Sequence, residues 1–331
     1  MTEPGKDIVK WADEAMFEAQ PIAKGKRGGP QVFLLSATSD PLGALAAGFR
    51  MYRGDPPYSL HDISDEERKW AWDESLKTHL KAPWEMIDFM FLLEGVSRAF
   101  THQLVRQRTA VYAQESLRFA VKRDVVDEAY IPPSIRGNEQ AELLYFKSIR
   151  YAEGYYNALV DAGIPAEDAR ALLPHATTTR VIYKTNFRGL MEHAGNRLCT
   201  QAQFEWRSVF LGIMNAIRSY NSEYYRALPE EAPEFYEVEQ ADWQWELIAT
   251  PIAQTFAPVC YKVGHCVFMG KLDRGCTIRD RVTAFAEAGI PAQDWGRSST
   301  TYKGLKTIMP EEWMADPMAG VTDEYNRRPN E

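Results

Sequence analysis

The chain has 331 residues, of which 45% are hydrophobic and 25% are charged, and its formal net charge is -8. This composition is typical of a globular protein with ample material for a core, and its acidic balance argues against nucleic acid as the main partner, because nucleic acids bind broad basic surfaces. No apolar run approaches the ~20 residues that span a bilayer, and the first residues lack the apolar stretch of a signal peptide.

The amino-terminal third is expected to combine helices and strands. A short apolar run that ends in turn formers predicts a buried strand. Alternating bulky residues after Pro83 indicate a second strand, with a helix as the open alternative, and Ser64 and Glu67 have the spacing of a capping box. In chain order we expect an amphipathic helix at the first residues, a strand at 31–38, a helix at 42–51, helical structure at 60–80 and a strand at 83–94.

The rest of the chain is expected to mix helices with further strands. Thr109, Val111 and Tyr112 are poor helix formers, so a loop and a short strand are expected at 109–123. A β-branched and aromatic run at 177–183 predicts another strand. Helices are expected at 97–108, as a pair at 136–162, between Pro165 and Pro174, over the long stretch 187–224 and at 276–288, with a break at 230–233 and a fraying tail from 316.

The densest basic segment lies between Val96 and Arg123, where six Lys and Arg residues accompany a single acid, Glu115. Guanidinium groups match phosphate and carboxylate geometry with two parallel hydrogen bonds. The segment therefore predicts a pocket for a small phosphorylated ligand, and a solvated basic helix face is the alternative. The basic residues are Arg98, Arg106, Arg108, Arg118, Lys122 and Arg123.

Two further segments carry arginines. Arg170 opens the sequence Arg-Ala-Leu-Leu-Pro, and Arg188, Glu192 and Asn196 fall at i, i+4 and i+8, which places them on one face of a helix. A helix face of this kind is usually solvated. It becomes a candidate site only if it faces the first arginine cluster.

The four cysteines, Cys199, Cys260, Cys266 and Cys276, are too few and too scattered for a disulfide framework. A reducing, cytoplasmic compartment is therefore expected. His265 lies among the last three, but their spacing lacks the tight Cys-x-x-Cys knuckle of a zinc site. We therefore expect buried or half-exposed thiols there and no metal.

Taken in order, these segments resemble the flavin-dependent thymidylate synthase family. The signature of that family is Arg-His-Arg, seven residues, then Ser, and this chain reads Arg106-Gln107-Arg108 and then Ser116. The segments 32–52, 170–174 and 186–203 follow in the family's order. The resemblance covers roughly residues 30 to 225. It implies an α+β fold in which helices flank a central mixed or antiparallel sheet, a catalytic domain at 1–250, and an extension of unknown role at 251–331.

The resemblance also implies two sets of site residues. Arg197 matches the arginine held against the pyrimidine, where a cation at the N3/O4 edge stabilises the anionic ring, and Arg197 and Ser116 are the expected catalytic residues. The residues expected to bind the nucleotide dUMP are Gln103, Arg106, Gln114, Ser116, Arg118, Arg170 and Arg197. Those expected to bind FAD are Arg106, Gln107, Arg108, Asn186, Arg188, Glu192 and Gln201.

The implied activity is the reductive methylation of dUMP to dTMP. Methylenetetrahydrofolate would give the carbon, FAD would carry the hydride and NADPH would reduce the FAD. A homotetramer with active sites between subunits is implied as well. We expect no nucleic acid and no membrane as partners, and the sequence leaves open whether the base is uracil or cytosine and whether the reductant is NADPH or NADH.

Several positions depart from the family pattern. Gln107 and Gln201 replace histidines, Gln114 stands where Glu is common, Glu192 where Asn is common, and Phe119 where Tyr is common. Glutamine forms hydrogen bonds but does not titrate near neutral pH. The substituted His and Glu positions motivate one alternative, a flavin-dependent pyrimidine-nucleotide hydroxymethylase on the same scaffold. The alternative from another class is a non-catalytic flavin- or nucleotide-binding protein, in which the tail or the 260–276 cysteines mediate partner contacts.

Overall fold

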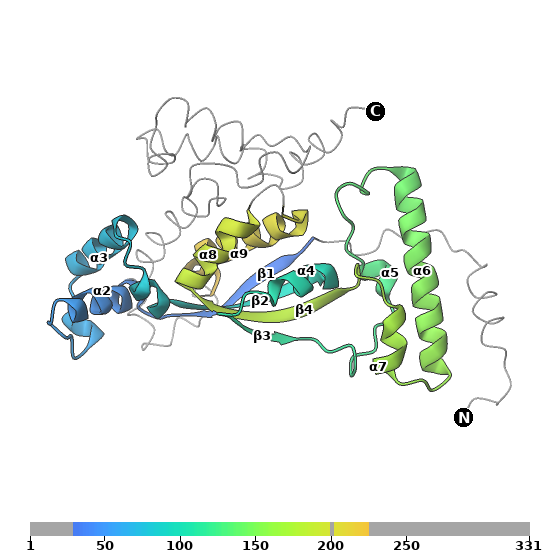
Figure 1. Ribbon diagram of the computed structural model, residues 1–331, viewed down its shortest axis with the longest axis horizontal. Coiled ribbons are helices and arrows are strands. Elements are labelled where there is room, and N and C mark those ends of the chain that lie inside the picture. Colours follow the sequence, from blue (N-terminus) through green and yellow to red (C-terminus); the bar gives the residue numbers. More distant parts are fainter. Residues whose placement is uncertain (1–28, 199–201, 225–331) are drawn as a thin grey trace.

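A computed structural model describes residues 29–198 and 202–224, and Figure 1 shows their arrangement. At the centre is a four-stranded sheet with the order β1-β2-β4-β3. All three neighbouring pairs of strands are antiparallel, so the expected α+β fold with an antiparallel sheet is confirmed. The strands are β1 (Gln31–Ala37), β2 (Asp88–Ser97), β3 (Val111–Gln114) and β4 (Thr178–Asn186).

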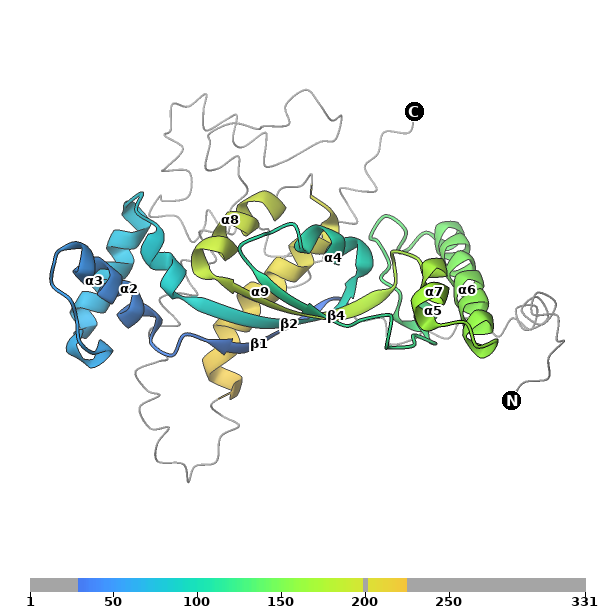
Figure 2. The same cartoon turned by 60° about the horizontal axis from the view of Figure 1, so that its bottom comes forward.

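Helices cover one face of the sheet and extend beyond both of its ends (Figure 1, Figure 2). Helices α4, α8 and α9 supply the residues that pack on the sheet, α2 and α3 lie at one end, and α5, α6 and α7 lie at the other. The helices are α2 (Pro41–Tyr52), α3 (Asp65–Lys77), α4 (Arg98–Leu104), α5 (Val125–Glu128), α6 (Glu139–Asp161), α7 (Ala166–Ala169), α8 (Phe187–Arg197) and α9 (Phe204–Tyr224), with 3-10 turns η1 (Leu60–Asp62), η2 (Ala82–Met86) and η3 (Arg170–Leu172).

The main core lies between the sheet and these helices. Along β2, Phe89, Phe91 and Leu93 are buried, whereas Met90 and Leu92 between them are half-buried. This period of two is typical of a strand with one covered face. The apolar positions predicted for the stretch 187–224 belong to this core or pack against it: Leu190, Ala194, Leu198, Val209, Phe210, Ile213, Met214 and Ile217.

Strand β1 is an edge strand, which corrects the expectation of a buried one. Phe33 is 46% and Leu35 41% exposed, because β1 has a neighbour on one side only and these residues do not face the core. Its pairing with β2 also shifts between Leu34 and Ser36, as at a β-bulge.

The long helical stretch expected at 187–224 is two helices, α8 and α9. A single helix of this length would extend roughly 57 Å, whereas a strand of ten residues such as β2 spans about 33 Å. The break lets both halves pack on the sheet. The pair expected at 136–162 is the single helix α6, whose buried Phe146, Ile149 and Tyr156 form one continuous stripe.

Two other boundaries differ from the expectation. The helix expected at 97–108 ends at Leu104, so the arginine signature lies in the turn before β3. The strand expected at 83–94 starts at Asp88, because Pro83 opens the 3-10 turn η2. The capping box is confirmed: the Glu67 backbone N–H donates to Ser64 Oγ at 3.2 Å, and the Ser64 N–H donates to the Glu67 carboxylate at 2.8 Å.

Several expectations lie outside the described residues. They are the amino-terminal helix, the four cysteines, Gln201, the break at 230–233, the helix at 276–288, the tail from 316 and the extension at 251–331. Within the part that the structure describes, no helix is long and apolar enough to cross a membrane.

Candidate active site

Arg197 is the last residue of α8, and uncharged groups hold its guanidinium. Its Nη1 donates to Gln103 Oε1 at 3.3 Å, and its Nε donates to His193 Nε2 at 3.4 Å. The guanidinium lies over the ring of Trp206, 4.7 Å from the centroid, a distance typical of a cation–π contact. The structure therefore brings Arg197 and Gln103 together, as the sequence predicts.

The charge on Arg197 has no acidic partner among the residues that the structure describes. No ion pair between described residues includes Arg197, and burial lowers its pKa. Burial and the charge of Arg197 together lower the pKa of His193 to about 4, so this imidazole is neutral near pH 7 and its Nε2 can accept a hydrogen bond. A half-buried cation without a counter-charge is a candidate site for an anionic or electron-rich ligand.

A chain of hydrogen bonds continues from Gln103 into the core. Gln103 Nε2 donates to Gln203 Oε1 at 2.5 Å, and Gln203 Nε2 donates to Glu205 Oε2 at 3.1 Å. Trp206 Nε1 donates to Gln103 Oε1 at 2.9 Å. The chain thus links the two predicted residues to Gln203 and Glu205, which are close in sequence to each other and far from Gln103.

Sequence reasoning did not find His193, Gln203, Glu205 or Trp206 as members of this group. One signal was available for Glu205, which precedes Val209 by four residues, so an acid lies on the otherwise apolar face of α9. Trp206 is buried, as expected for a packing residue, and its indole N–H and ring also hold Gln103 and Arg197.

A second group of predicted residues surrounds the turn that follows β3. Arg118 pairs with the Glu167 carboxylate at 2.8 Å, and Arg170 Nε donates to the Glu167 carbonyl oxygen at 3.1 Å. The Arg118 backbone N–H donates to Ser116 Oγ at 3.3 Å. The structure therefore gathers Ser116, Arg118 and Arg170, all predicted for the nucleotide.

Arg98 joins this second group from the first residue of α4. Its Nη2 donates to the Glu115 carbonyl oxygen at 3.0 Å. Burial lowers its pKa, and the charge of Arg170 acts in the same direction. Three guanidinium groups thus surround the Ser116 turn, a concentration of positive charge that suits a phosphate.

Helix α4 contributes a residue to each of the two groups. Helix α4 carries Arg98 at its start and Gln103 near its end. Thr101 lies between these two residues in the helix, and its Oγ1 accepts a hydrogen bond from Gln114 Nε2 of β3 at 3.1 Å. Among the described residues, no hydrogen bond or ion pair of Arg197 or Gln103 reaches Ser116 or the arginines around it.

The residues predicted for the flavin form a third group, near the start of α8. The hydroxyl of Tyr183 donates to Gln107 Oε1 at 2.7 Å, and Gln107 Nε2 donates to Thr185 Oγ1 at 3.2 Å. The Gln107 side chain is therefore turned toward β4. Asn186 caps α8, because its Oδ1 accepts the Gly189 N–H at 2.8 Å.

Arg188 lies two residues after Asn186 and is ion-paired with Glu85 at 2.6 Å and with Glu192 at 3.0 Å. Arg106 and Arg108 are exposed. Guanidinium groups such as those of Arg106, Arg108 and Arg188 suit the diphosphate of an anionic dinucleotide. Gln201, the other predicted flavin contact, lies outside the described residues.

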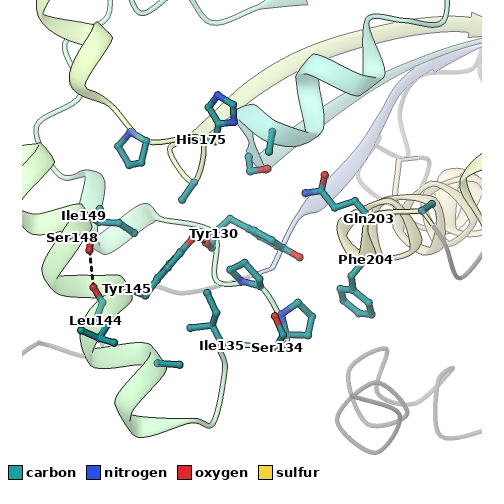
Figure 3. A pocket seen from close by; sticks show the side chains of 18 residues that line it. Tyr130, Ser134, Ile135, Leu144, Tyr145, Ser148, Ile149, His175, Gln203 and Phe204 are labelled. Carbon is teal, nitrogen blue, oxygen red and sulfur yellow. Dashed lines mark hydrogen bonds between the residues drawn. The ribbon is translucent and has the colours of Figure 1, made fainter. Parts of the chain in front are cut away.

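A cavity of about 810 Å³ adjoins the first group (Figure 3). Gln203 and Phe204 lie on one side of it, and Tyr130, Tyr145 and Ile135 face them across the opening. Ser97 also lines the cavity. The hydrogen-bond chain from Arg197 therefore ends at the wall of a largely apolar space.

Residues 33–220 of the chain match the family model described as thymidylate synthase complementing protein. A flavin-dependent thymidylate synthase of Geobacter sulfurreducens is 33% identical over 190 residues, which cover 57% of this chain and 82% of that protein. The flavin-dependent thymidylate synthase of Sulfolobus acidocaldarius is 32% identical over 195 residues, covering 57% and 72%. A solved structure of a UMP/dUMP methylase from Streptomyces cacaoi, bound with 5-Br dUMP, shares the fold at a TM-score of 0.50 and 20% identity, covering 57% of this chain and 90% of that one.

Proposed function

Because this chain belongs to the thymidylate synthase complementing protein family, we propose that it is a flavin-dependent thymidylate synthase that converts dUMP to dTMP. Methylenetetrahydrofolate is the proposed carbon donor, FAD the cofactor and NADPH the reductant. C5 of the pyrimidine loses a proton and gains a methyl group, and NADPH supplies the reducing equivalents that turn the transferred methylene into that methyl.

The observation that carries this proposal is the uncompensated cation of Arg197 beside Gln103. Uracil C5 is a weak nucleophile, and its reactivity rises when negative charge on the ring is stabilised. We assign Arg197 to the N3/O4 edge of the base, where its guanidinium stabilises that charge. Gln103 holds the guanidinium through its Oε1 and has a second amide N–H available for the base.

We assign the phosphate of dUMP to the second group, where Ser116, Arg118 and Arg170 gather. The hydroxyl and the two guanidinium groups are donors that suit phosphate oxygens. The Glu167 carboxylate pairs with Arg118, and the Glu167 carbonyl oxygen accepts from Arg170. Arg106 and Gln114, the other residues predicted for the nucleotide, flank these groups from the turn before β3 and from β3.

We propose that these two groups, Arg197 with Gln103 and Ser116 with Arg118 and Arg170, come from different copies of the chain, as the family resemblance implies. In a closed, symmetric assembly, the residues that bind the phosphate in one copy can complete the residues that bind the base in another copy. We propose a cytoplasmic homotetramer in which every active site is completed in this way.

We assign FAD to Arg106, Arg108 and Arg188, with Gln107, Asn186, Glu192 and Gln201 as further contacts. When bound, FAD would supply the hydride that it receives from NADPH. The chain's own contribution is charge and orientation: the arginines offset the negative diphosphate, and Asn186 keeps the first turn of α8 in place.

The test is mass spectrometry of the nucleotide product. The purified full-length protein is incubated anaerobically with FAD, NADPH, methylenetetrahydrofolate and either dUMP or UMP, because the methylase of the same fold is described as acting on both. A dUMP product heavier by one methylene unit supports the proposal. Unchanged nucleotide in every reaction contradicts it and favours a non-catalytic flavin- or nucleotide-binding protein.

A hydroxymethyl product would identify the second candidate function. The observation that favours it is Gln107, whose side chain is held by Tyr183 and Thr185 and cannot titrate as the family histidine can. In that reaction water terminates the transfer in place of hydride. Oxygen from labelled water in the product separates the two outcomes.

A further inference from the structure

Glu205 is fully buried, at 0% exposure, and has no cationic partner in the ion pairs between described residues. Its Oε1 accepts the Ser97 backbone N–H at 2.6 Å, and its Oε2 accepts the Ser97 hydroxyl at 2.6 Å. A buried carboxylate costs several kcal/mol unless it is well hydrogen-bonded. Glu205 is therefore a candidate for a role beyond packing.

The groups at the two ends of the hydrogen-bond chain determine the direction of each bond in it. An ionised Glu205 can only accept, so Gln203 turns its amide nitrogen toward Glu205 and its oxygen toward Gln103. Gln103 then turns its own nitrogen toward Gln203 and its oxygen toward Arg197. At that end the guanidinium and the Trp206 indole can only donate. All the bonds in the chain are mutually compatible.

We propose that Glu205 is a positioning residue, which fixes the orientation of the Gln203 and Gln103 amides and so the place of the Arg197 guanidinium in the base site. The identity of the ligand rests on the proposed function. The coupling of Glu205 to Gln103 is a property of the protein alone.

The same geometry predicts that the base site responds to pH. Burial raises the pKa of Glu205 to about 7, against the hydrogen bonds from Ser97, which lower it. A protonated Glu205 can donate, so Gln203 is no longer forced to present its nitrogen. The site is then expected to bind its ligand more weakly below pH 7 than above it.

Tyr130, Tyr145 and His193 do not titrate in this range. Tyr130 and Tyr145 face it from the cavity wall and from α6, and burial together with the Glu205 charge raises both pKa values, that of Tyr145 to about 12. Arg136 and Arg207 face Tyr130 and oppose that rise. On the side of Arg197, burial keeps His193 neutral.

The experiment compares dUMP binding by the full-length wild type and by Glu205→Gln, measured by calorimetry between pH 6 and pH 8.5, a range of roughly one unit or more around the expected midpoint. At the alkaline end the variant is expected to bind dUMP about 10-fold more weakly, because a misplaced binding group loses much of its effect. It is also expected to lose the part of the pH dependence that is centred near 7 in the wild type.

Glu153→Gln is the matched control. Glu153 is also a partly buried carboxyl with a pKa raised by burial, and it accepts the Val126 N–H at 2.7 Å, but its hydrogen bonds do not lead to Gln103. It is expected to bind dUMP as the wild type does. If Glu205→Gln and Glu153→Gln give the same affinity and pH profile, the proposal is wrong.

A second variant covers the case in which Glu205→Gln does not fold. Gln203→Met leaves the bonds between Glu205 and Ser97 in place and breaks the chain one step later. It is expected to lose the same pH dependence, and the double variant is expected to be no weaker than either single one. Additive losses would contradict the coupling.

If the wild type does not bind dUMP, a measurement on the ligand-free protein still tests whether Glu205 positions Gln103. The side-chain amide signal of Gln103, observed by NMR with ¹⁵N-labelled glutamine and assigned by its absence in Gln103→Glu, is expected to shift with a midpoint near pH 7. The shift is expected to be absent in Gln203→Met. If the Gln103 signal changes neither with pH nor in Gln203→Met, Glu205 does not position Gln103 and the proposal is wrong. If only dUMP binding fails, the proposed function is wrong and the positioning role is not.

Discussion

The hydroxyl of Tyr183 donates to Gln107 Oε1 at 2.7 Å, so the middle residue of the arginine signature is bound to the central sheet. Burial raises the pKa of Tyr183 well above its ordinary value, so this hydroxyl remains a donor at every physiological pH. Gln107 accepts this bond with its Oε1, and its Nε2 donates to Thr185 Oγ1. The glutamine at this position thus satisfies two buried groups of β4.

Removing this hydroxyl is expected to destabilise the protein. Tyr183→Phe leaves Gln107 Oε1 without its donor, which costs about 1–3 kcal/mol when a buried acceptor is left unsatisfied. Urea unfolding of the variant and the wild type measures the difference. Tyr58→Phe, at a side chain that is 95% exposed, is the control and should not change the free energy of unfolding.

Removing the charge of Arg197 is expected to abolish turnover without unfolding the protein. Arg197→Met keeps an aliphatic contact with Trp206 and removes the cation, so turnover of dUMP should fall by on the order of 100-fold or more. The free energy of unfolding should stay within about 1 kcal/mol of the wild type, because the lost cation–π contact is offset by relief of an unpaired, half-buried charge. Steady-state assays and urea unfolding check both values.

Arg180→Met is the matched control for that substitution. Arg180 pairs with Glu94 at 2.8 Å, and its side chain is 63% exposed. Its turnover should equal that of the wild type. If Arg197→Met also has the turnover of the wild type, Arg197 is not part of the active site.

Mixing two inactive variants tests whether sites are shared between copies. Arg197→Met disables the residues that bind the base, and Arg118→Met disables the residues that bind the phosphate. Each variant alone should therefore be inactive. If each site joins the two groups from different copies, unfolding and refolding an equal mixture should restore about a quarter of wild-type turnover, because random assembly pairs two intact groups in that share of sites. No recovery from the refolded mixture would place both groups in the same copy.

The free energy of unfolding is expected to fall as pH rises because of Glu205. Its pKa is about 7 in the folded protein and about 4.3 in an unfolded chain, so between these values the folded state binds more protons. By linkage, stability then decreases across this window, by at most on the order of 3 kcal/mol for this group. Urea unfolding at roughly pH 5, inside this window, and roughly pH 8, above it, should show a smaller decrease in Glu205→Gln than in the wild type, and an identical decrease would contradict the assignment.

Local patterns predicted local structure well. Ser64 and Glu67 form their capping box within a few residues, and the alternation along β2 separates Phe91 from Leu92 as a half-covered sheet requires. Such signals depend on neighbours in sequence. They do not show where a helix must stop to fit a sheet, which is why 187–224 was expected as one stretch.

The candidate site residues were predicted from the family resemblance, segment by segment. Arg197 and Gln103 were assigned to the same ligand and lie 3.3 Å apart. Glu205 was missed because its role depends on Ser97 and Gln203, one of them 108 positions away. The inward turn of Gln107 depends on Tyr183 in the same way, since the partner is on another strand.

The irregular pairing of β1 has a consequence for how copies of this chain can meet. Its register shift between Leu34 and Ser36 interrupts the free backbone edge on one side of the sheet, and β3 at the other side is only four residues long. Neither edge offers a long regular ladder of unpaired amides to an incoming strand. Growth of the sheet from one molecule into the next is therefore disfavoured, and we expect association to depend on side chains, with finite assemblies rather than fibres as the product.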